Sequence, residues 1–387
     1  MRILSIETSC DETAVSMVEA SGNTENSKFK VLGDTILSQI DMHREFGGVF
    51  PTVAKREHAR HLIPSIEKVL KESNVVSGIK YKELGKEKKT KIEEILKREP
   101  ELLARFKDFI ESIENPNLDA IVVTSGPGLE PALWIGINVA QALSLAWKVP
   151  LVPVNHMEGH IVSSLLENEA IKRMSFPALA LLISGGHTEL VLIKDWLSYE
   201  VIGRTRDDAV GEAFDKVARM LGLSYPGGPE ISKLAHQARV HNKQLKERLP
   251  RPMLDSDTYD FSFSGLKTAV LYMVKNISNI NEETRQKIAR EFEDAVTEVL
   301  ISKTMRAVEE YNIKTLIIGG GVSANTEIRR IFEEETHRLK NIEFLLPDKN
   351  LSTDNAIMIA AAGYLHLLLE KDKASATEIK ADGNLSL

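Results

Sequence analysis

Two histidines four residues apart, His156 and His160, are the side chains whose type and spacing first suggest chemistry. Residues four apart lie on one face of a helix, with Cβ atoms about 5–6 Å apart. That spacing is within reach of a single metal ion, and imidazole is the commonest metal ligand in proteins. An apolar strand at 149–154 would position the pair. Two ligands do not make a site, so the alternative of two polar residues opening a surface helix stays open.

A third metal ligand is offered by Asp354, which lies in the sequence Thr353-Asp354-Asn355 before an Ala-rich helical stretch at 356–369. Two histidines and a carboxylate with open coordination positions form a known catalytic arrangement. Thr, Asp and Asn are also ordinary N-cap residues of helices. Both interpretations of this segment therefore remain open from the sequence.

Composition and charge limit the classes of function. The 387 residues are 43% hydrophobic and 27% charged, which is typical of a soluble protein. Forty-nine basic against 56 acidic residues give a net charge of -7, so we expect any RNA binding to be local or shared with a partner.

The single Cys10 excludes an intrachain disulfide and a cysteine-based zinc site. No apolar run is clean enough to span a membrane, and we predict a cytoplasmic protein.

The order of predicted elements repeats along the chain. A β-hairpin at 3–18 precedes a strand–Gly turn–helix unit at 120–147, and the same events recur at 179–194 and 315–335. This internal duplication predicts two similar α/β lobes facing across a cleft. The segment 74–117 is rich in Lys and Glu and predicts a charged helical insertion, broken into two helices at Pro100.

Glycine-rich turns in both halves favour a nucleotide ligand. The turn Ser184-Gly185-Gly186-His187 suits a phosphate, because glycine lets backbone N–H groups approach its oxygens. The glycines at 319–321 suit close approach of a ribose or purine. Asp215 could accept both hydroxyls of a ribose, although a carboxylate near a helix start is equally often a cap. None of the turns matches a P-loop or a properly placed dinucleotide-binding fingerprint.

A series of motifs resembles the TsaD family, which forms threonylcarbamoyladenosine in tRNA. The matches follow one another in order over nearly the whole chain and include Ile6-Glu7-Thr8-Ser9-Cys10-Asp11-Glu12-Thr13, Ser125-Gly126-Pro127-Gly128-Leu129, His156-Met157-Glu158-Gly159-His160, Ser184-Gly185-Gly186-His187-Thr188, Tyr225-Pro226-Gly227-Gly228-Pro229 and the segments 207–216, 260–267, 320–325 and 353–355. The resemblance implies the duplicated actin-like fold of sugar kinases, Hsp70 and actin, called the ASKHA fold. It also implies transfer of the threonylcarbamoyl group from threonylcarbamoyl-AMP to N6 of the adenosine just 3′ of the anticodon, in tRNAs that read codons starting with A, with release of AMP.

The resemblance also implies the site residues. The metal ligands would be His156, His160 and Asp354, binding one divalent ion, Fe²⁺ in our prediction with Zn²⁺ as the alternative. The adenylate would be held by Leu182, Ile183, Ser184, Gly185, Gly186, Asp215, Gly228 and Asn325. Asp11 and Glu12 would transfer protons, with turn capping as the alternative. The expected partners are tRNA, a TsaB-like paralogue, a TsaE-like ATPase and a TsaC-type synthase.

We predict that residues 1–152 and 356–387 form the N-terminal lobe, including the insertion, and that 153–355 form the C-terminal lobe. Asn155 stands where many relatives have a further histidine, so we expect no third histidine ligand. Three other functions are weighed against transfer: a metallopeptidase, a non-catalytic nucleotide-binding subunit and a sugar kinase. The spacing argues against the first, because Glu158 lies two residues after His156 rather than one.

Overall fold

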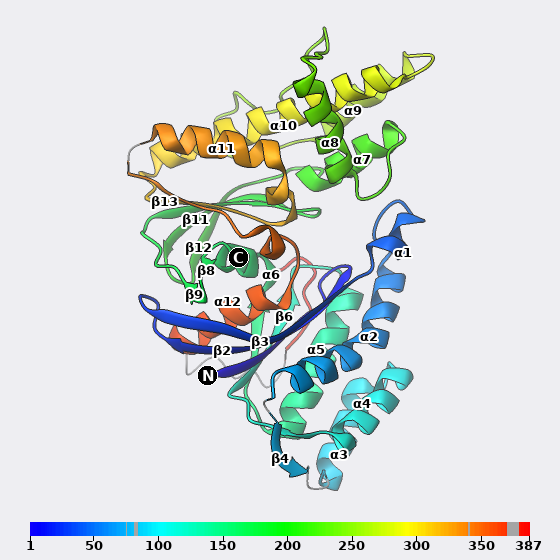
Figure 1. Cartoon of the computed structure of the whole chain (residues 1–387), viewed down its shortest axis with the longest axis vertical. Helices are drawn as coiled ribbons and strands as arrows, with labels where there is room; N and C mark the ends of the chain where they lie inside the picture. Colours follow the sequence, from blue (N-terminus) through cyan, green and yellow to red (C-terminus); the bar gives the residue numbers. More distant parts are fainter. Residues whose placement is uncertain (75, 81–83, 340, 370–378) are drawn as a thin grey trace. The chain divides into compact units, whose positions relative to one another are not determined.

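The computed structural model divides the chain into two compact units. The description covers residues 1–74, 76–80, 84–339, 341–369 and 379–387 (Figure 1). Unit 1 consists of Met1–Asp41, Val49–Arg173 and Asp354–Leu387. Unit 2 consists of Met42–Gly48 and Met174–Thr353.

The boundary between the units differs from the predicted boundary between the lobes. We expected the second lobe to begin at residue 153, whereas unit 1 continues to Arg173 and resumes at Asp354. The reason is the packing of helix α6 (His156–Ser163) on helix α12 (Ala356–Leu369). At Gly159 the helices are so close that an added Cβ would lie 2.9 Å from Cδ1 of Ile359. Both histidines therefore belong to unit 1.

Unit 1 is built on a five-stranded sheet in the order β3-β2-β1-β6-β7. The predicted hairpin is present, with Ile3 of β1 opposite Val18 of β2. On its other edge β1 pairs in parallel with β6, where Ile3 is opposite Ala120. The strands are β1 (Arg2–Glu7), β2 (Glu12–Gly22), β3 (Ser27–Ser38), β6 (Ala120–Gly126) and β7 (Leu151–Asn155). Parallel strands end at the same edge of a sheet, so β1, β6 and β7 deliver their last residues to one place.

Unit 2 repeats this sheet, in the order β12-β11-β10-β13-β14. The central strand again forms a hairpin on one side and a parallel pair on the other. The strands are β10 (Ala178–Ile183), β11 (Thr188–Asp195), β12 (Ser198–Arg204), β13 (Thr315–Gly319) and β14 (Glu343–Leu345). The predicted duplication is therefore confirmed, and β12 and β14 are strands that the sequence analysis lacked.

Helices cover both faces of the sheet in unit 1. Leu4 and Ile6 of β1 point into the core shared with α2 and α5. Ser5, between them, points the other way and donates a hydrogen bond to the backbone oxygen of Ala356 at the start of α12, at 2.7 Å. Side chains that alternate between two buried faces are typical of a strand in a sheet that is covered on both sides. The remaining helices of the unit are α2 (Pro51–Glu72), α3 (Lys86–Leu96), α4 (Pro100–Ser112) and α5 (Glu130–Trp147).

The predicted insertion consists of α3 and α4, and α4 begins at Pro100 as expected from the proline. Two short strands, β4 (Val76–Lys80) and β5 (Glu114–Pro116), pair antiparallel on either side of these helices. Other short elements of the chain are α1 (Ile40–Arg44), β8 (Leu166–Glu167), β9 (Ala170–Ile171), η1 (Gly321–Ala324) and η2 (Lys349–Leu351).

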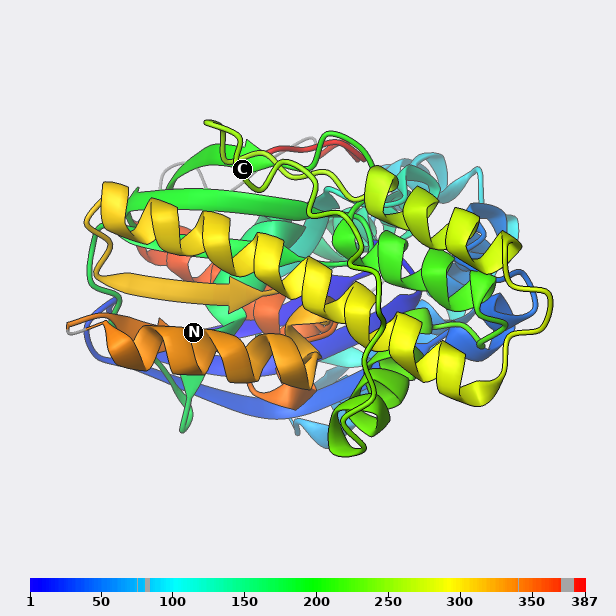
Figure 2. The ribbon, with the colours of Figure 1, turned by 90° about the horizontal axis from the view of Figure 1, so that it is seen from above.

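In unit 2 a helical layer packs on the sheet around an aromatic core. Phe214 and Phe292 meet edge to face with ring centroids 5.0 Å apart. Figure 2 shows α10 and α11 side by side, as their contacts require. The helices are α7 (Val210–Met220), α8 (Gly227–Val240), α9 (Ser264–Lys275), α10 (Glu282–Glu310) and α11 (Thr326–Arg338). Within the described residues, no helix of either unit is long and apolar enough to cross a membrane.

Candidate metal centre and nucleotide site

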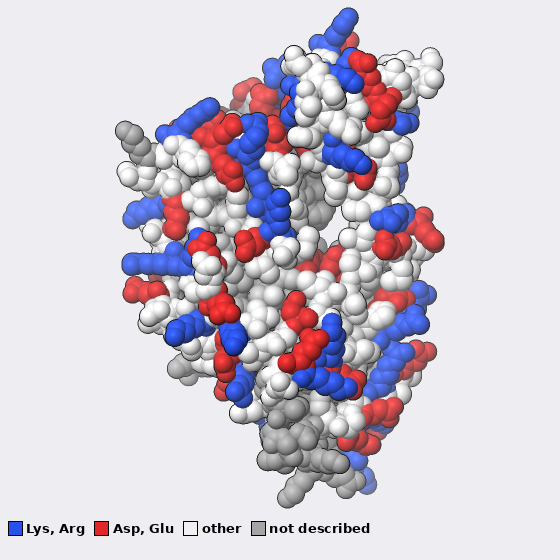
Figure 3. Space-filling view, viewed as in Figure 1, with Lys and Arg blue, Asp and Glu red and all other residues white. Residues whose placement is uncertain are grey.

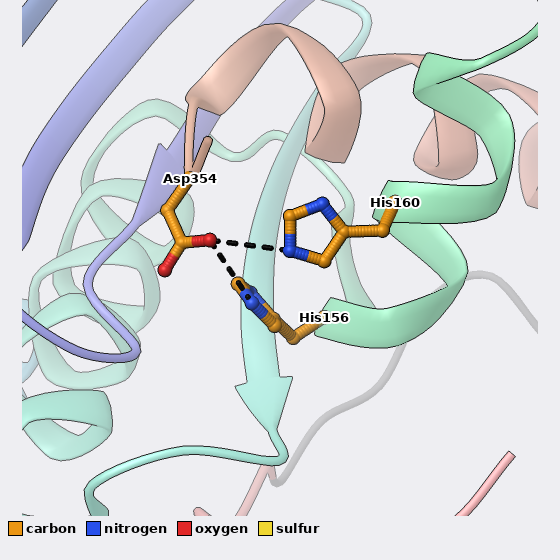
Figure 4. A group of neighbouring side chains, drawn as sticks. All are labelled: His156, His160 and Asp354. Atoms are coloured by element: carbon orange, nitrogen blue, oxygen red, sulfur yellow. Dashed lines mark ion pairs between the residues drawn. The ribbon is translucent and has the colours of Figure 1, made fainter. Parts of the chain in front are cut away.

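Three side chains of unit 1 converge in the way that the metal prediction requires. Nε2 of His156 lies 3.4 Å from Oδ1 of Asp354, and Nε2 of His160 lies 3.2 Å from the same oxygen (Figure 4). One ligand atom from each residue lies within 4.8 Å of the others. Figure 4 shows both imidazoles projecting from α6 toward the carboxylate that precedes α12. This group could hold a metal ion.

The start of α6 explains how the two histidines come to share a site. Oδ1 of Asn155 accepts hydrogen bonds from the backbone N–H groups of Met157 at 2.8 Å and Glu158 at 3.4 Å. Asn155 is thus the N-cap, and the helix begins at His156 itself. Every residue of α6 is buried, so the alternative of a surface helix was wrong.

The segment before α12 carries both of the roles that the sequence left open. Oδ1 of Asn355 accepts a hydrogen bond from the backbone N–H of Met358 at 2.9 Å, which is an N-cap contact. The preceding residue, Asp354, therefore has its carboxylate available to face His156 and His160. The cap is Asn355 and the candidate ligand is Asp354, so the two roles belong to two neighbouring residues.

The electrostatics of the cluster suit a cation. Burial would raise the pKa of Asp354, but the charge of His156 beside it holds that pKa well below its ordinary value. Burial would likewise lower the pKa of His156, but Asp354 and Glu7 raise it well above its ordinary value. His160 is fully buried, and within the described residues its Nδ1 has no hydrogen-bond partner and its Nε2 has only the contact with Asp354. A buried imidazole with so few partners, beside an ionised carboxylate, fits a metal ligand set.

Glu7 is a member of this site that the sequence analysis missed. Its Oε2 lies 3.1 Å from Nδ1 of His156, and its side chain is fully buried. The available signal was a charged residue at the end of the mainly apolar strand from Ile3 to Ile6. A buried charge requires a partner, and the sequence did not show which residue that was.

The predicted proton-transfer pair consists of Asp11, in the turn between β1 and β2, and Glu12, the first residue of β2. Burial, followed by the negative charge of Asp11, raises the pKa of Glu12 well above its ordinary value. The charge of Asp354 acts in the same direction, so the pair is within electrostatic range of the candidate ligands. A carboxyl group with a raised pKa keeps its proton to a higher pH than an ordinary glutamate and is a stronger base once ionised.

Glu158, the acid on the histidine helix, faces away from the cluster. Its Oε2 lies 2.8 Å from Nε2 of His366 on α12. A metallopeptidase of the His-Glu-x-x-His type needs its glutamate beside the metal as general base. The geometry therefore gives no support to the peptidase alternative.

The predicted nucleotide residues lie in unit 2, and contacts link their four segments. Gly211 in the first turn of α7 donates its N–H to the backbone oxygen of Ser184 at 3.2 Å, and an added Cβ there would lie 2.6 Å from that oxygen. Gly320 has φ +88°, and an added Cβ would lie 2.5 Å from the backbone oxygen of Ile183. The Ser184 turn is thus packed between the start of α7 and the Gly320 turn.

Asp215 joins α7 to the next segment, because its Oδ1 accepts a hydrogen bond from the backbone N–H of Gly227 at 2.7 Å. Three of the predicted glycines, Gly185, Gly186 and Gly228, have no atom within 4 Å of an added Cβ. Backbone that faces open space can be approached closely by a ligand.

The side chain of Asn325, which is predicted to hold the adenylate, also makes contacts within the protein. Its Oδ1 caps α11 by accepting from the N–H groups of Glu327 and Ile328, each at 3.0 Å. Its Nδ2 donates to Oε1 of the buried Glu293 at 2.7 Å. The oxygen and one N–H of the amide are therefore occupied within the protein, and these contacts hold the turn between β13 and α11.

Comparison with solved structures defines the class of fold. Full-length HypF, in a phosphate- and nucleotide-bound crystal form, matches 95% of this chain and 55% of its own, with a TM-score of 0.54 and 14% sequence identity. Together with the repeated sheet order, this likeness confirms the duplicated actin-like fold shared by sugar kinases and Hsp70.

The sequence then defines the family within that class. A model of the TsaD family, described as tRNA N6-adenosine threonylcarbamoyltransferase, matches residues 30–80 and 106–361. Proteins with that name from Bacillus cereus and Staphylococcus carnosus are each 42% identical over 386 residues, covering 100% of this chain and 96% of theirs. The chain belongs to the TsaD family. The family match passes over 81–105, which lies inside the predicted insertion.

Proposed function

We propose that this chain transfers the threonylcarbamoyl group from threonylcarbamoyl-AMP to N6 of the adenosine immediately 3′ of the anticodon, in tRNAs that read codons starting with A. The new bond joins N6 to the carbamoyl carbon, and the bond to the phosphate oxygen breaks, so that AMP leaves and the amine loses a proton. The observation that carries the proposal is the convergence of His156, His160 and Asp354 in a chain of this family.

We propose that these three residues bind one divalent metal, Fe²⁺ with Zn²⁺ as the alternative. Two imidazoles and a carboxylate leave coordination positions open for a substrate. A bound metal would act as a Lewis acid on the carbonyl of the threonylcarbamoyl group. The contribution of the chain is an ionised Asp354 and two buried imidazoles held on one short helix. Because the pKa of His156 is raised, metal binding at neutral pH would release its proton.

The adenylate would lie against the glycine turns of unit 2. Leu182, Ile183, Ser184, Gly185 and Gly186 form the end of β10 and the turn after it, whose backbone could donate to phosphate oxygens. We propose that Asp215 and Gly228 contact the ribose, supported by the open space at Gly228. We propose that Asn325 also helps to hold the adenylate, while its contacts with Glu293 and Glu327 keep the Gly320–Gly321 turn in place. Asp11 and Glu12 would accept and relay the N6 proton, supported by the raised pKa of Glu12.

We further propose that tRNA binding requires companion proteins. With a net charge of -7 the chain lacks the basic excess of a protein that binds RNA alone. On the face in Figure 3, Lys and Arg side chains are interspersed with Asp and Glu rather than gathered into one field. A TsaB-like paralogue, a TsaE-like ATPase and a TsaC-type synthase, all in the cytoplasm, would complete the surface and supply the adenylate.

Reconstitution tests the function. The chain is combined with the three companion proteins, unmodified tRNA, threonine, bicarbonate and ATP, and the nucleosides are analysed by mass spectrometry. We expect threonylcarbamoyladenosine in the complete mixture and none when the chain is omitted. A complete mixture that makes no product, although the synthase is shown to supply the adenylate, would contradict the proposal.

A further inference from the structure

We infer that Glu7 is a positioning residue for His156: its carboxylate selects the ring tautomer that turns Nε2 toward the metal. The inference rests on the metal site of the proposed function. Glu7 is the last residue of β1, fully buried, with Oε2 3.1 Å from Nδ1 of His156. The other ring nitrogen, Nε2, lies 3.4 Å from Oδ1 of Asp354. One imidazole thus has a different carboxylate at each nitrogen.

The strand order explains why Glu7 is beside this histidine. β1, β6 and β7 are adjacent and parallel, and they end at Glu7, Gly126 and Asn155. His156 is the next residue after β7. The register of the sheet therefore places Glu7 beside His156, at the edge where the carboxyl ends of these strands meet.

The carboxylate of Glu7 is itself held in place. Oγ1 of Thr124 donates to Oε2 at 2.5 Å, and the backbone N–H of Ser9 donates to Oε1 at 2.5 Å. Each oxygen thus has one fixed donor. A carboxylate held in this way cannot turn aside from His156 without breaking both hydrogen bonds.

An ionised carboxylate only accepts hydrogen bonds, so it requires the proton of a neutral His156 to be on Nδ1. That leaves the lone pair of Nε2 for a metal, which is how a carboxylate commonly orients a ligating histidine. Oγ of Ser9 also lies 3.2 Å from Nδ1, but a hydroxyl both donates and accepts and so selects neither tautomer. His160 has no hydrogen-bonded partner of this kind among the described residues.

The same geometry predicts a strong effect of Glu7→Gln. The Ser9 N–H can only donate, so the amide oxygen of glutamine must occupy the Oε1 position. The NH₂ group is then forced to face Nδ1 of His156, which must accept from it. The ring proton moves to Nε2 and blocks the metal position. An isosteric change would thus reverse the tautomer.

Glu158→Gln is a matched control. Glu158 is also a nearly fully buried glutamate, and its Oε2 lies 2.8 Å from a histidine nitrogen, that of His366. It is carried by the histidine helix but points away from the cluster. Loss of a buried carboxylate–histidine pair is common to both variants, and only Glu7→Gln alters a candidate ligand.

The experiment titrates the purified full-length wild type and both variants with Zn²⁺ against a chelating indicator. Urea unfolding of the metal-free proteins is measured in parallel. We expect Glu7→Gln to bind Zn²⁺ about 10- to 100-fold more weakly, and Glu158→Gln to bind as wild type even if it is equally destabilised. Equal weakening by both variants, or unchanged affinity in Glu7→Gln, would overturn the inference.

A second measurement does not depend on the variants folding. In ¹⁵N-histidine-labelled wild type loaded with Zn²⁺, we expect the His156 signal, assigned by its loss in His156→Gln, to show a protonated Nδ1 and a metal-bound Nε2. Metal on Nδ1 would contradict the role of Glu7 even if transfer activity is confirmed. If the wild-type protein binds no Zn²⁺, the result contradicts the proposed metal site itself, and therefore also this inference.

Discussion

Nε2 of His160 lies 3.2 Å from Oδ1 of Asp354, although one residue is on α6 and the other precedes α12. The contact depends on the close packing of these helices at Gly159, where an added Cβ would lie within 3.1 Å of Met358 Cγ. A residue without a side chain between the two histidines therefore lets a distant carboxylate reach the candidate ligand set.

Removing one ligand should abolish tight metal binding. We expect His156→Ala and Asp354→Asn each to lose more affinity for Zn²⁺ or Fe²⁺ than the roughly 10- to 100-fold typical of outer-shell partners, and to lose transfer activity. His366→Gln, which alters a histidine outside the cluster, should keep both. Metal content by mass spectrometry of the anaerobically loaded proteins, with circular dichroism to confirm the fold, tests this. Full occupancy in either ligand variant would exclude the ligand set.

Nucleotide affinity should respond to a methyl group at Gly228. Because an added Cβ meets no atom within 4 Å, Gly228→Ala should change the free energy of unfolding by less than about 0.5 kcal/mol. AMP binding, measured by calorimetry, should weaken at least several-fold if the ligand lies against this backbone. Gly85→Ala, which also has open space but lies before α3, should leave AMP binding unaltered. Unaltered binding in Gly228→Ala would place the nucleotide elsewhere.

Asn325→Ala should be more destabilising than removal of an ordinary cap. It removes an N-cap, worth about 1 kcal/mol, and a donor to the buried Glu293, worth about another 1 kcal/mol. Asn281 caps α10 through a single contact to the N–H of Thr284, so Asn281→Ala should cost only about 0.5–1 kcal/mol. Urea unfolding of both variants gives the comparison. Equal costs would show that the contact with Glu293 adds no stability.

Stability at alkaline pH should depend on Lys303. Burial, with the charge of Arg306, lowers the pKa of this ammonium group to about 8. The group donates hydrogen bonds to Ser256 Oγ and the backbone oxygen of Thr258, and so holds the loop that contains these two residues. In the unfolded chain the pKa is about 10.4. Between these values the unfolded chain binds more protons, so the contribution of Lys303 to the free energy of unfolding rises with pH.

The comparison with Lys303→Met isolates this contribution from other groups that titrate. We expect the free energy of unfolding of wild type, relative to that of the variant, to increase by about 1–2 kcal/mol from pH 8 to pH 10, allowing for screening by solvent. It should be constant between pH 6 and pH 7. Urea unfolding at each pH measures it, and a difference that falls above pH 8 would contradict the assigned pKa.

The sequence by itself determined the features that depend on local pattern. Alternating and helical periodicities identified the two hairpin–strand–turn–helix repeats, and Pro100 marked the start of α4 in the insertion. The spacing of His156 and His160 placed them on one helical face. Ordered motifs over the whole chain identified the family, which the comparisons confirmed. These signals are short-range, because each depends on neighbours within a turn or a strand.

Only the tertiary structure decided which distant residues meet. It separated the cap role of Asn355 from the position of Asp354, assigned the histidine helix to unit 1, and brought Glu7 to Nδ1 of His156. It also showed β12, whose half-exposed residues lack a clear apolar alternation and depend on pairing with β11. The physical reason is that sheet register and helix packing are set by burial of complementary surfaces, and a local pattern does not encode the partner.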